Sequence, residues 1–159
     1  DAAAEHLEEA HAISEERDDP FTTAQVHLER SRLALSRDNL ETATELVEEA
    51  TDLFDDIGAT HQHARSQAVR GRIAAAAGDR STAREYWRSA LDTFEAVGAP
   101  QDALATAARL VESYEREGAD ENARTWRQRA EEYVADAPAA SVEEFRTVLE
   151  PPPADDDDD

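Results

Sequence analysis

The stretch GDRSTAREYWRSALDTFEAVGAP, residues 78–100, contains the spacing pattern from which the fold can be inferred. Ala83, Trp87 and Ala90 follow one another at spacings of four and three residues, and Phe94 comes four residues later. These intervals place the four side chains on one face of a helix. A core helix would usually carry leucine at such positions, whereas this one carries alanine at two of them. We infer that neighbouring backbones approach the helix so closely there that only a small side chain fits.

The same pattern recurs every forty residues. Shifting the chain by forty aligns an Ala-x3-bulky-x2-Ala pattern four times, and LFDDIGAT (53–60) then matches TFEAVGAP (93–100). The aligned triplets are Ala3, Leu7 and Ala10; Ala43, Val47 and Ala50; Ala83, Trp87 and Ala90; and Ala123, Arg127 and Ala130. A fixed period of this length is typical of architectures in which similar units stack on one another.

Each unit predicts two helices, because apolar residues recur at intervals of three and four and no stretch alternates as a strand would. We expect first helices at 21–37, 62–77 and 101–117, and second helices at 39–57, 80–97 and 121–136. Glycine can take a positive φ between the two helices of a pair, Asn or Asp can cap the second helix, and proline fits a first turn. These roles fall to Gly78 and Gly118 (turns), Asn39, Asp79 and Asp120 (caps), and Pro20 and Pro100 (helix starts).

This alanine pattern, with Gly71 in a first helix and Gly78-Asp79 at the turn, resembles the tetratricopeptide repeat over about residues 1–136. The forty-residue period is similar to the long variety of that repeat in bacterial and archaeal regulators and sensors. The resemblance implies an all-α fold, a right-handed α-α superhelix of about three helical hairpins with a partial N-terminal unit and a C-terminal capping helix. Two positions depart from the repeat, because Ser31 and Val111 stand where the alignment with Gly71 predicts glycine. Arg127 replaces the bulky residue, which predicts a terminal, partly solvated unit.

We expect one repeat domain over residues 1–150. Its parts are a partial unit at about 1–20, full units at 21–60, 61–100 and 101–140, and a capping helix at 141–150. Ser141-Val142-Glu143-Glu144 reads as the capping box that begins this last helix. The partial unit is either an N-terminal cap or what remains after upstream repeats were removed. Residues 151–159, PPPADDDDD, cannot bury apolar surface and are expected to form a disordered acidic tail.

The composition is strongly acidic, with 38 acidic residues against 16 basic ones, a net charge of −22. All the basic residues are arginine, and the composition resembles proteins of salt-accumulating haloarchaea, in which salt screens self-repulsion. The alternative is an acidic interaction protein from a GC-rich mesophile. The charge disfavours direct binding to nucleic acid or anionic lipid. Because the chain has no cysteine, we expect no thiolate chemistry. Because it has neither a long apolar run nor a signal-peptide pattern, we expect a cytoplasmic protein.

The resemblance implies that the first helices line a concave face, the usual binding surface of such arrays. The positions expected to contact a partner are Gln25, Leu28, Arg32, Leu35, Arg65, Ala68, Arg72 and Arg116. Residues 61–90 carry two acids against six arginines, and we expect Arg32, Arg65 and Arg72 to converge. Arginine captures carboxylates with two parallel hydrogen bonds, which predicts an acidic peptide as partner. The alternative is that Arg65, Arg72, Arg84 and Arg88 pair with acids of adjacent helices.

Other candidate sites have a simpler structural interpretation. His61 and His63 are two residues apart and lack a third ligand nearby, so we expect a solvated loop between units and no metal. We expect Trp87 to pack in the core and Trp126 to be partly exposed. The lysine and asparagine set of the chaperone-binding carboxylate clamp is absent. No GxSxG, GxxxxGK[ST] or HExxH motif occurs, so we expect neither catalytic residues nor a cofactor.

These observations favour a non-catalytic protein- or peptide-binding adaptor or scaffold that uses the concave face. The expected partner is a protein or peptide, with an acidic peptide as the favoured class, and neither nucleic acid nor a membrane. An acidic segment of the chain itself, Asp155 to Asp159, is a candidate competitor for the same surface. The alternative is a ligand-sensing regulatory domain of a larger transcriptional or signalling protein. An enzyme is a third class, which a bound metal or a closed polar pocket would favour.

Overall fold

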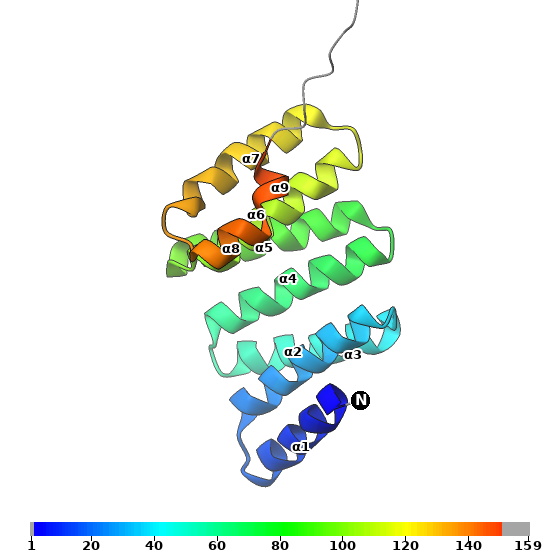
Figure 1. Ribbon diagram of the computed structural model, residues 1–159. Coiled ribbons are helices and arrows are strands. Elements are labelled where there is room, and N and C mark those ends of the chain that lie inside the picture. The colour runs from blue at the N-terminus through cyan, green and yellow to red at the C-terminus, as the bar shows by residue number, and fades with distance from the viewer. Residues whose placement is uncertain (1, 151–159) are drawn as a thin grey trace, which may run out of the picture. The chain divides into compact units, whose positions relative to one another are not determined.

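The computed structural model describes residues 2–150, and within this range the chain folds into nine helices and no strand. Consecutive helices pack as hairpins, α2 with α3, α4 with α5 and α6 with α7 (Figure 1). The predicted all-α fold of successive helical hairpins is therefore confirmed. None of the helices between residues 2 and 150 is long and apolar enough to span a bilayer.

The chain divides into two compact units, one ending at Val97 and the other beginning at Gly98. The helices of the first unit are α1 (Ala2–Glu16), α2 (Pro20–Ser36), α3 (Leu40–Asp56), α4 (Thr60–Ala76) and α5 (Arg80–Val97). Those of the second are α6 (Pro100–Glu115), α7 (Asp120–Val134), α8 (Ala139–Glu144) and α9 (Arg146–Leu149). The six helices of the three hairpins end within two residues of the predicted bounds.

The turns inside the hairpins need a residue with positive φ. Gly78 and Gly118 have φ values of 88° and 70°, as predicted. The turn between α2 and α3 contains no glycine, and Asp38 takes the left-handed conformation there with φ of 60°. Aspartate tolerates this region better than most side chains, so the turn keeps its geometry.

Two of the three predicted helix caps are present. The side chains of Asn39 and Asp79 accept hydrogen bonds from the backbone N–H three residues further on, at 3.3 and 3.1 Å. The prediction for Asp120 is wrong, because Ala119 is the N-cap of α7 and offers no side-chain acceptor. Asp120 is instead the first helical residue, where its carboxylate lies near the positive end of the helix dipole.

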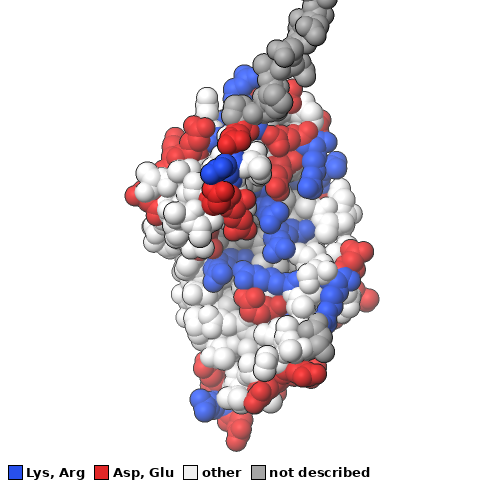
Figure 2. All heavy atoms as spheres, in the orientation of Figure 1, with Lys and Arg blue, Asp and Glu red and all other residues white. Residues whose placement is uncertain are grey.

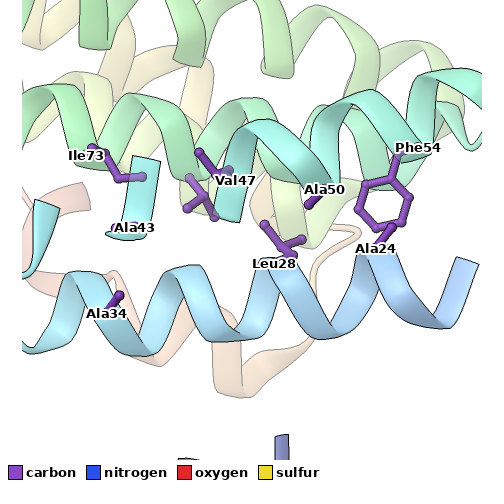
Figure 3. Close-up of a cluster of buried hydrophobic side chains, with 9 residues drawn as sticks. Ala24, Leu28, Ala34, Ala43, Val47, Ala50, Phe54 and Ile73 are labelled. Atoms are coloured by element: carbon purple, nitrogen blue, oxygen red, sulfur yellow. The ribbon is translucent and has the colours of Figure 1, made fainter. Parts of the chain in front are cut away.

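The repeated alanines are buried where helices pack. Ala43, Ala83 and Ala123 are at most 2% exposed. The second alanines of the pattern, Ala50, Ala90 and Ala130, are at most 1% exposed. Ala43 and Ala50 join a core cluster drawn from α2, α3 and α4 (Figure 3). Ser31 of α2 donates a hydrogen bond of 2.7 Å to the backbone carbonyl of Ala43, so the two backbones lie within reach of one short side chain.

The bulky residue between the two alanines faces a small residue of the first helix. A Cβ atom added at Gly71 of α4 would lie 2.4 Å from the indole Nε1 of Trp87, so only glycine leaves room for the ring. That Nε1 donates to the carbonyl of Ala68 at 3.2 Å. Where the bulky position holds the smaller Val47, the aligned position of the first helix holds Ser31 in place of glycine.

The partial solvation predicted for the last unit does not extend to Arg127 itself. Its side chain is buried, with the whole residue 7% exposed. Its Nε donates to the backbone carbonyl of Val148 in α9 at 3.0 Å, and its guanidinium forms a salt bridge with Glu115 of α6. The arginine therefore replaces an apolar core residue by tying α7 to two other helices.

The C-terminal closing element differs from the predicted single helix that begins at Ser141. The helix starts earlier, at Ala139 after Pro138, so Ser141 lies inside α8 and is buried. The backbone breaks at Phe145, and α9 continues beyond it. Both short helices pack on the α6–α7 hairpin, with Phe145 and Leu149 against its apolar cluster. The predicted tail, residues 151–159, lies outside the described residues.

Candidate functional site

Helix α4 is positively charged along one side. It contains Arg65, Arg70 and Arg72 and no acidic residue. Arg65 and Arg72 are seven residues apart, which places them on one face of the helix about two turns from each other, and both are partly exposed. Figure 2 shows arginine side chains gathered over this part of the first unit. In a chain with a net charge of −22, α4 thus offers a local attraction for anions.

Arg70 faces a different direction and has structural partners. Its Nη2 lies 3.9 Å from a carboxylate oxygen of Glu48 in α3, and its guanidinium lies 4.7 Å from the ring centre of Tyr86 in α5. Arg70 is therefore engaged by residues of the two neighbouring helices, α3 and α5.

A cavity of about 270 Å³ lies beside Arg65 in the first unit. It is lined by Leu7, Thr22, Gln25, Val26, Leu28, Glu29, Phe54, Gln62 and Arg65. Four of these side chains are apolar, whereas the amides, the hydroxyl, the carboxylate and the guanidinium can form hydrogen bonds. A volume of this size suits a single apolar side chain with polar groups next to it.

The cavity brings three of the predicted contact residues together, Gln25 and Leu28 from α2 and Arg65 from α4. Leu28 is only 3% exposed, so it serves the core more than a partner. Arg32 lies further along α2 and forms a salt bridge of 2.6 Å with Glu29. This pair fixes one arginine of the predicted cluster next to the cavity wall.

The other predicted residues lie away from the cavity lining. Leu35 packs at the edge of the core cluster of the first unit. Ala68 is half-buried, and its carbonyl accepts the hydrogen bond from Trp87. Arg72 is on the cationic face of α4. Arg116 ends α6 in the second unit and is exposed there.

Sequence reasoning missed six of the lining residues. Thr22 and Glu29 lie three and four positions from Gln25, and Gln62 lies three before Arg65, so helical spacing could have indicated these three. Val26 directly follows Gln25 in the sequence. Leu7 and Phe54 belong to α1 and α3. No local signal shows that these helices contribute to a surface formed mainly by α2 and α4.

The histidines near the start of α4 do not form a loop, contrary to the prediction. His61 and His63 lie in the first turns of α4, and the ring of His61 packs edge to face on Phe94 with centroids 5.8 Å apart. Within residues 2–150, no group of three or more His, Cys, Asp or Glu side chains is arranged to hold a metal ion.

The two tryptophans take the positions expected of them. Trp87 is buried, 4% exposed, as a packing residue of the α4–α5 hairpin. Trp126 is partly buried against the core of the second unit, with the guanidinium of Arg129 5.3 Å from its ring centre.

The fold and this surface define an all-α protein of consecutive helical hairpins with a cationic first helix in its middle hairpin. Among solved structures, the chain is similar to the crystal structure of BtubC (BKLC) from P. vanneervenii, with a TM-score of 0.70 and 17% sequence identity. The likeness covers 82% of this chain and 55% of BtubC, so this chain spans just over half of that protein's length. At this identity the likeness shows a shared fold. No family model and no curated protein matches the chain.

Proposed function

We propose that this protein is a non-catalytic adaptor or scaffold of the tetratricopeptide type, which binds an acidic peptide segment on the α2–α4 side of its first unit. The observation that carries the proposal is the cavity with apolar walls next to Arg65, on a helix without any acidic residue. An apolar pocket beside a few well-placed polar groups is the usual form of a recognition site.

The dimensions suggest how a peptide fits. An apolar side chain occupies the cavity, and Gln25 and Gln62 can both donate to and accept from the peptide backbone. Arg65 and Arg72 are seven residues apart, about 10 Å along the helix, which an extended peptide spans in about three residues. The peptide that fits best therefore has an apolar residue followed by two acidic residues three positions apart.

The test is a fluorescence-anisotropy titration with the labelled peptide Leu-Asp-Ser-Ser-Asp. The charge reversals Arg65→Glu and Arg72→Glu, made together, should weaken binding by about tenfold or more, since each removes a charge-assisted hydrogen bond. The matched control is Arg80→Glu with Arg88→Glu, which changes the net charge equally on exposed positions of α5. Equal losses in both double variants would show that only overall charge matters, and this outcome rejects the site.

Two further peptides separate the contribution of the carboxylates from that of the apolar side chain. Leu-Asn-Ser-Ser-Asn removes the carboxylates, and Gly-Asp-Ser-Ser-Asp removes the side chain meant for the cavity. Both should bind more weakly than the parent peptide. If Gly-Asp-Ser-Ser-Asp binds as well as the parent, the cavity plays no part in recognition.

A ligand-sensing regulatory domain is the second candidate, and the small volume of the cavity favours it. The compound 4-methylpentanoate has the leucine side chain and one carboxylate and serves as the probe. Binding as tight as that of the peptide would favour the sensor, because the peptide's second carboxylate and backbone would then contribute nothing.

The setting proposed for this activity is the cytoplasm of a salt-accumulating cell. The support is the excess of 22 negative charges together with the absence of lysine. Binding should therefore be measured over a range of potassium chloride, because salt screens attraction between exposed charges.

A further inference from the structure

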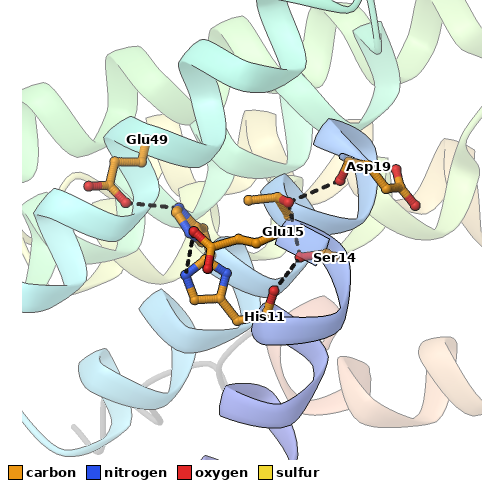
Figure 4. A network of polar contacts seen from close by, with 7 residues as sticks. His11, Ser14, Glu15, Asp19 and Glu49 are labelled. Carbon is orange, nitrogen blue, oxygen red and sulfur yellow. Dashed lines mark hydrogen bonds and ion pairs between the residues drawn. The ribbon is translucent and has the colours of Figure 1, made fainter. Parts of the chain in front are cut away.

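Two histidine rings are in contact where α1 packs against α2. The rings of His11 and His27 are arranged edge to face with centroids 4.9 Å apart (Figure 4). Their side chains are 25% and 12% exposed. His11 Nδ1 and His27 Nε2 are buried and have no hydrogen-bond partner within residues 2–150. Two titratable rings are thus in contact with little water around them.

The charged groups around this pair come from three helices. Glu49 of α3 has a carboxylate oxygen 2.8 Å from His27 Nδ1, and Glu15 of α1 has one 3.9 Å from His11 Nε2. Both glutamates are more than half exposed, so water screens their attraction. Burial lowers the pKa of His27, Glu49 opposes this, His11 and Arg30 lower it further, and Glu15 raises it. The net direction is downward, so the folded chain favours the neutral imidazole.

The corresponding contact one repeat later has no titratable pair. Thr51 of α3 aligns with His11, and its hydroxyl donates to that of Ser66 in α4 at 3.0 Å. Gln67 aligns with His27. At these aligned positions the α3–α4 contact therefore has uncharged polar side chains, whereas the α1–α2 contact has two histidines.

Little apolar burial holds α1 in place. Ser14 is its one buried residue, and this side chain shares a hydrogen bond of 3.0 Å with Thr23 of α2. Ala3 is exposed and Leu7 and Ala10 are half-buried, whereas the aligned residues of α3 are at most 1% exposed. A change of charge in the contact therefore competes with few stabilising interactions.

We propose that His11 and His27 form a pH-operated latch: when both rings are protonated their like charges repel, and α1 separates from α2 while α2–α5 stay packed. Repulsion at this distance is strong because the rings are shielded from water. Leu7 of α1 lines the candidate cavity, so separation also removes part of its wall. This last consequence rests on the proposed function, whereas the latch itself does not.

The direction of the pH effect follows from the lowered pKa of His27. An imidazole whose pKa is lower in the folded chain than its ordinary value of 6.5 stabilises docking fully above that value. The stabilisation is lost as the pH falls through 6.5 towards the lower folded value. Docking of α1 should thus weaken as the pH falls below 6.5.

Amide hydrogen exchange of the full chain, corrected for the intrinsic effect of pH, tests the latch. Between about pH 8 and about pH 5, the protection of the α1 amides should fall by about tenfold or more, while α3 and α5 keep theirs. The comparison variant is His11→Thr with His27→Gln, which copies the residues of the α3–α4 contact. Its α1 protection should not change with pH.

The latch is overturned if α1 in the natural sequence is equally protected at both pH values, or if the double variant loses as much protection. Should the double variant fail to fold, each single substitution provides the test, because each leaves one ring and removes the repulsion. Either must then lose less protection than the natural sequence. The readout involves no peptide, so it stands or falls separately from the binding proposal.

Discussion

At the scale of single residues, the hairpins are specified by complementary sizes across the contact of two helices. Gly71 faces Trp87, and the smaller Val47 has Ser31 on the facing helix in place of glycine. In the last hairpin, the first-helix residue that aligns with Ser31 and Gly71 is Val111, which is larger than either. The volume allowed at one position therefore depends on the residue that packs against it.

Gly71→Ala tests this dependence. The new methyl group would overlap the indole of Trp87 and strain its hydrogen bond to Ala68, so we expect a loss of about 1–3 kcal/mol in the free energy of unfolding. Urea unfolding followed by circular dichroism measures it. In a Trp87→Val background, the same substitution should cost less than half as much. Equal costs in both backgrounds would show that the ring does not require the glycine.

The sequence predicted the buried alanines but not how the exceptions would be accommodated. Ala43, Ala83 and Ala123 follow from spacing alone, because a helix repeats every 3.6 residues. The burial of Arg127 was not predicted, because its partners Glu115 and Val148 are distant in sequence and no periodic pattern indicates them.

At the scale of helices, the starts of α2, α3 and α5 have side chains that accept a hydrogen bond from the first turn. Hydrogen bonds from the hydroxyl and the backbone N–H of Thr22 lower the pKa of Asp19, which caps α2. The backbone N–H and then the hydroxyl of Thr82 do the same for Asp79. Both carboxyls therefore favour the charged form in the folded chain.

Asp79→Ala should change the response of stability to acid. Because the pKa of Asp79 is lowered by folding, its contribution is present above 3.8 and is lost as the pH falls through the folded value. The melting temperature of the variant should lie below that of the natural sequence at neutral pH, and the two should converge in acid. Thermal unfolding at a series of pH values measures this. If the difference in melting temperature between the two proteins were the same at every pH, the charge of Asp79 would play no part in stability.

Helix ends were predictable where the signal is local, and not where packing decides. Proline, glycine and Asx residues placed the hairpin helices to within two residues. The closing element was not predictable in the same way, because Pro138 starts α8 before the apparent cap at Ser141. The break at Phe145 places that ring on the core of α6 and α7. Such contacts between distant residues have no local signature.

At the scale of the whole molecule, the net charge of −22 dominates the response to solution conditions. We expect the melting temperature to rise with potassium chloride, since the screening length falls from about 10 Å at 0.1 M to about 3 Å at 1 M. Most of the gain should come below about 1 M, where screening changes most. Calorimetry at several salt concentrations measures it. A melting temperature that falls or stays constant would contradict the importance of self-repulsion.

Three of the nine residues that line the candidate cavity were predicted from the sequence. The first helices and the cationic character of α4 follow from repeat register and charge. The cavity itself does not, because Leu7 and Phe54 reach it from the second helices of neighbouring repeats. The cavity is formed by residues of four helices, α1 to α4, so it depends on how these helices pack. Neither composition nor repeat register indicates that packing.

The most direct test of the central claim is nuclear magnetic resonance of the isotope-labelled chain during titration with Leu-Asp-Ser-Ser-Asp. The account predicts that backbone amide shifts concentrate on α2 and α4, around Gln25, Gln62, Arg65 and Arg72, and are lost with Arg65→Glu and Arg72→Glu together. Shifts centred on α3, α5 or α7, or a spectrum that the peptide leaves unchanged, would contradict it.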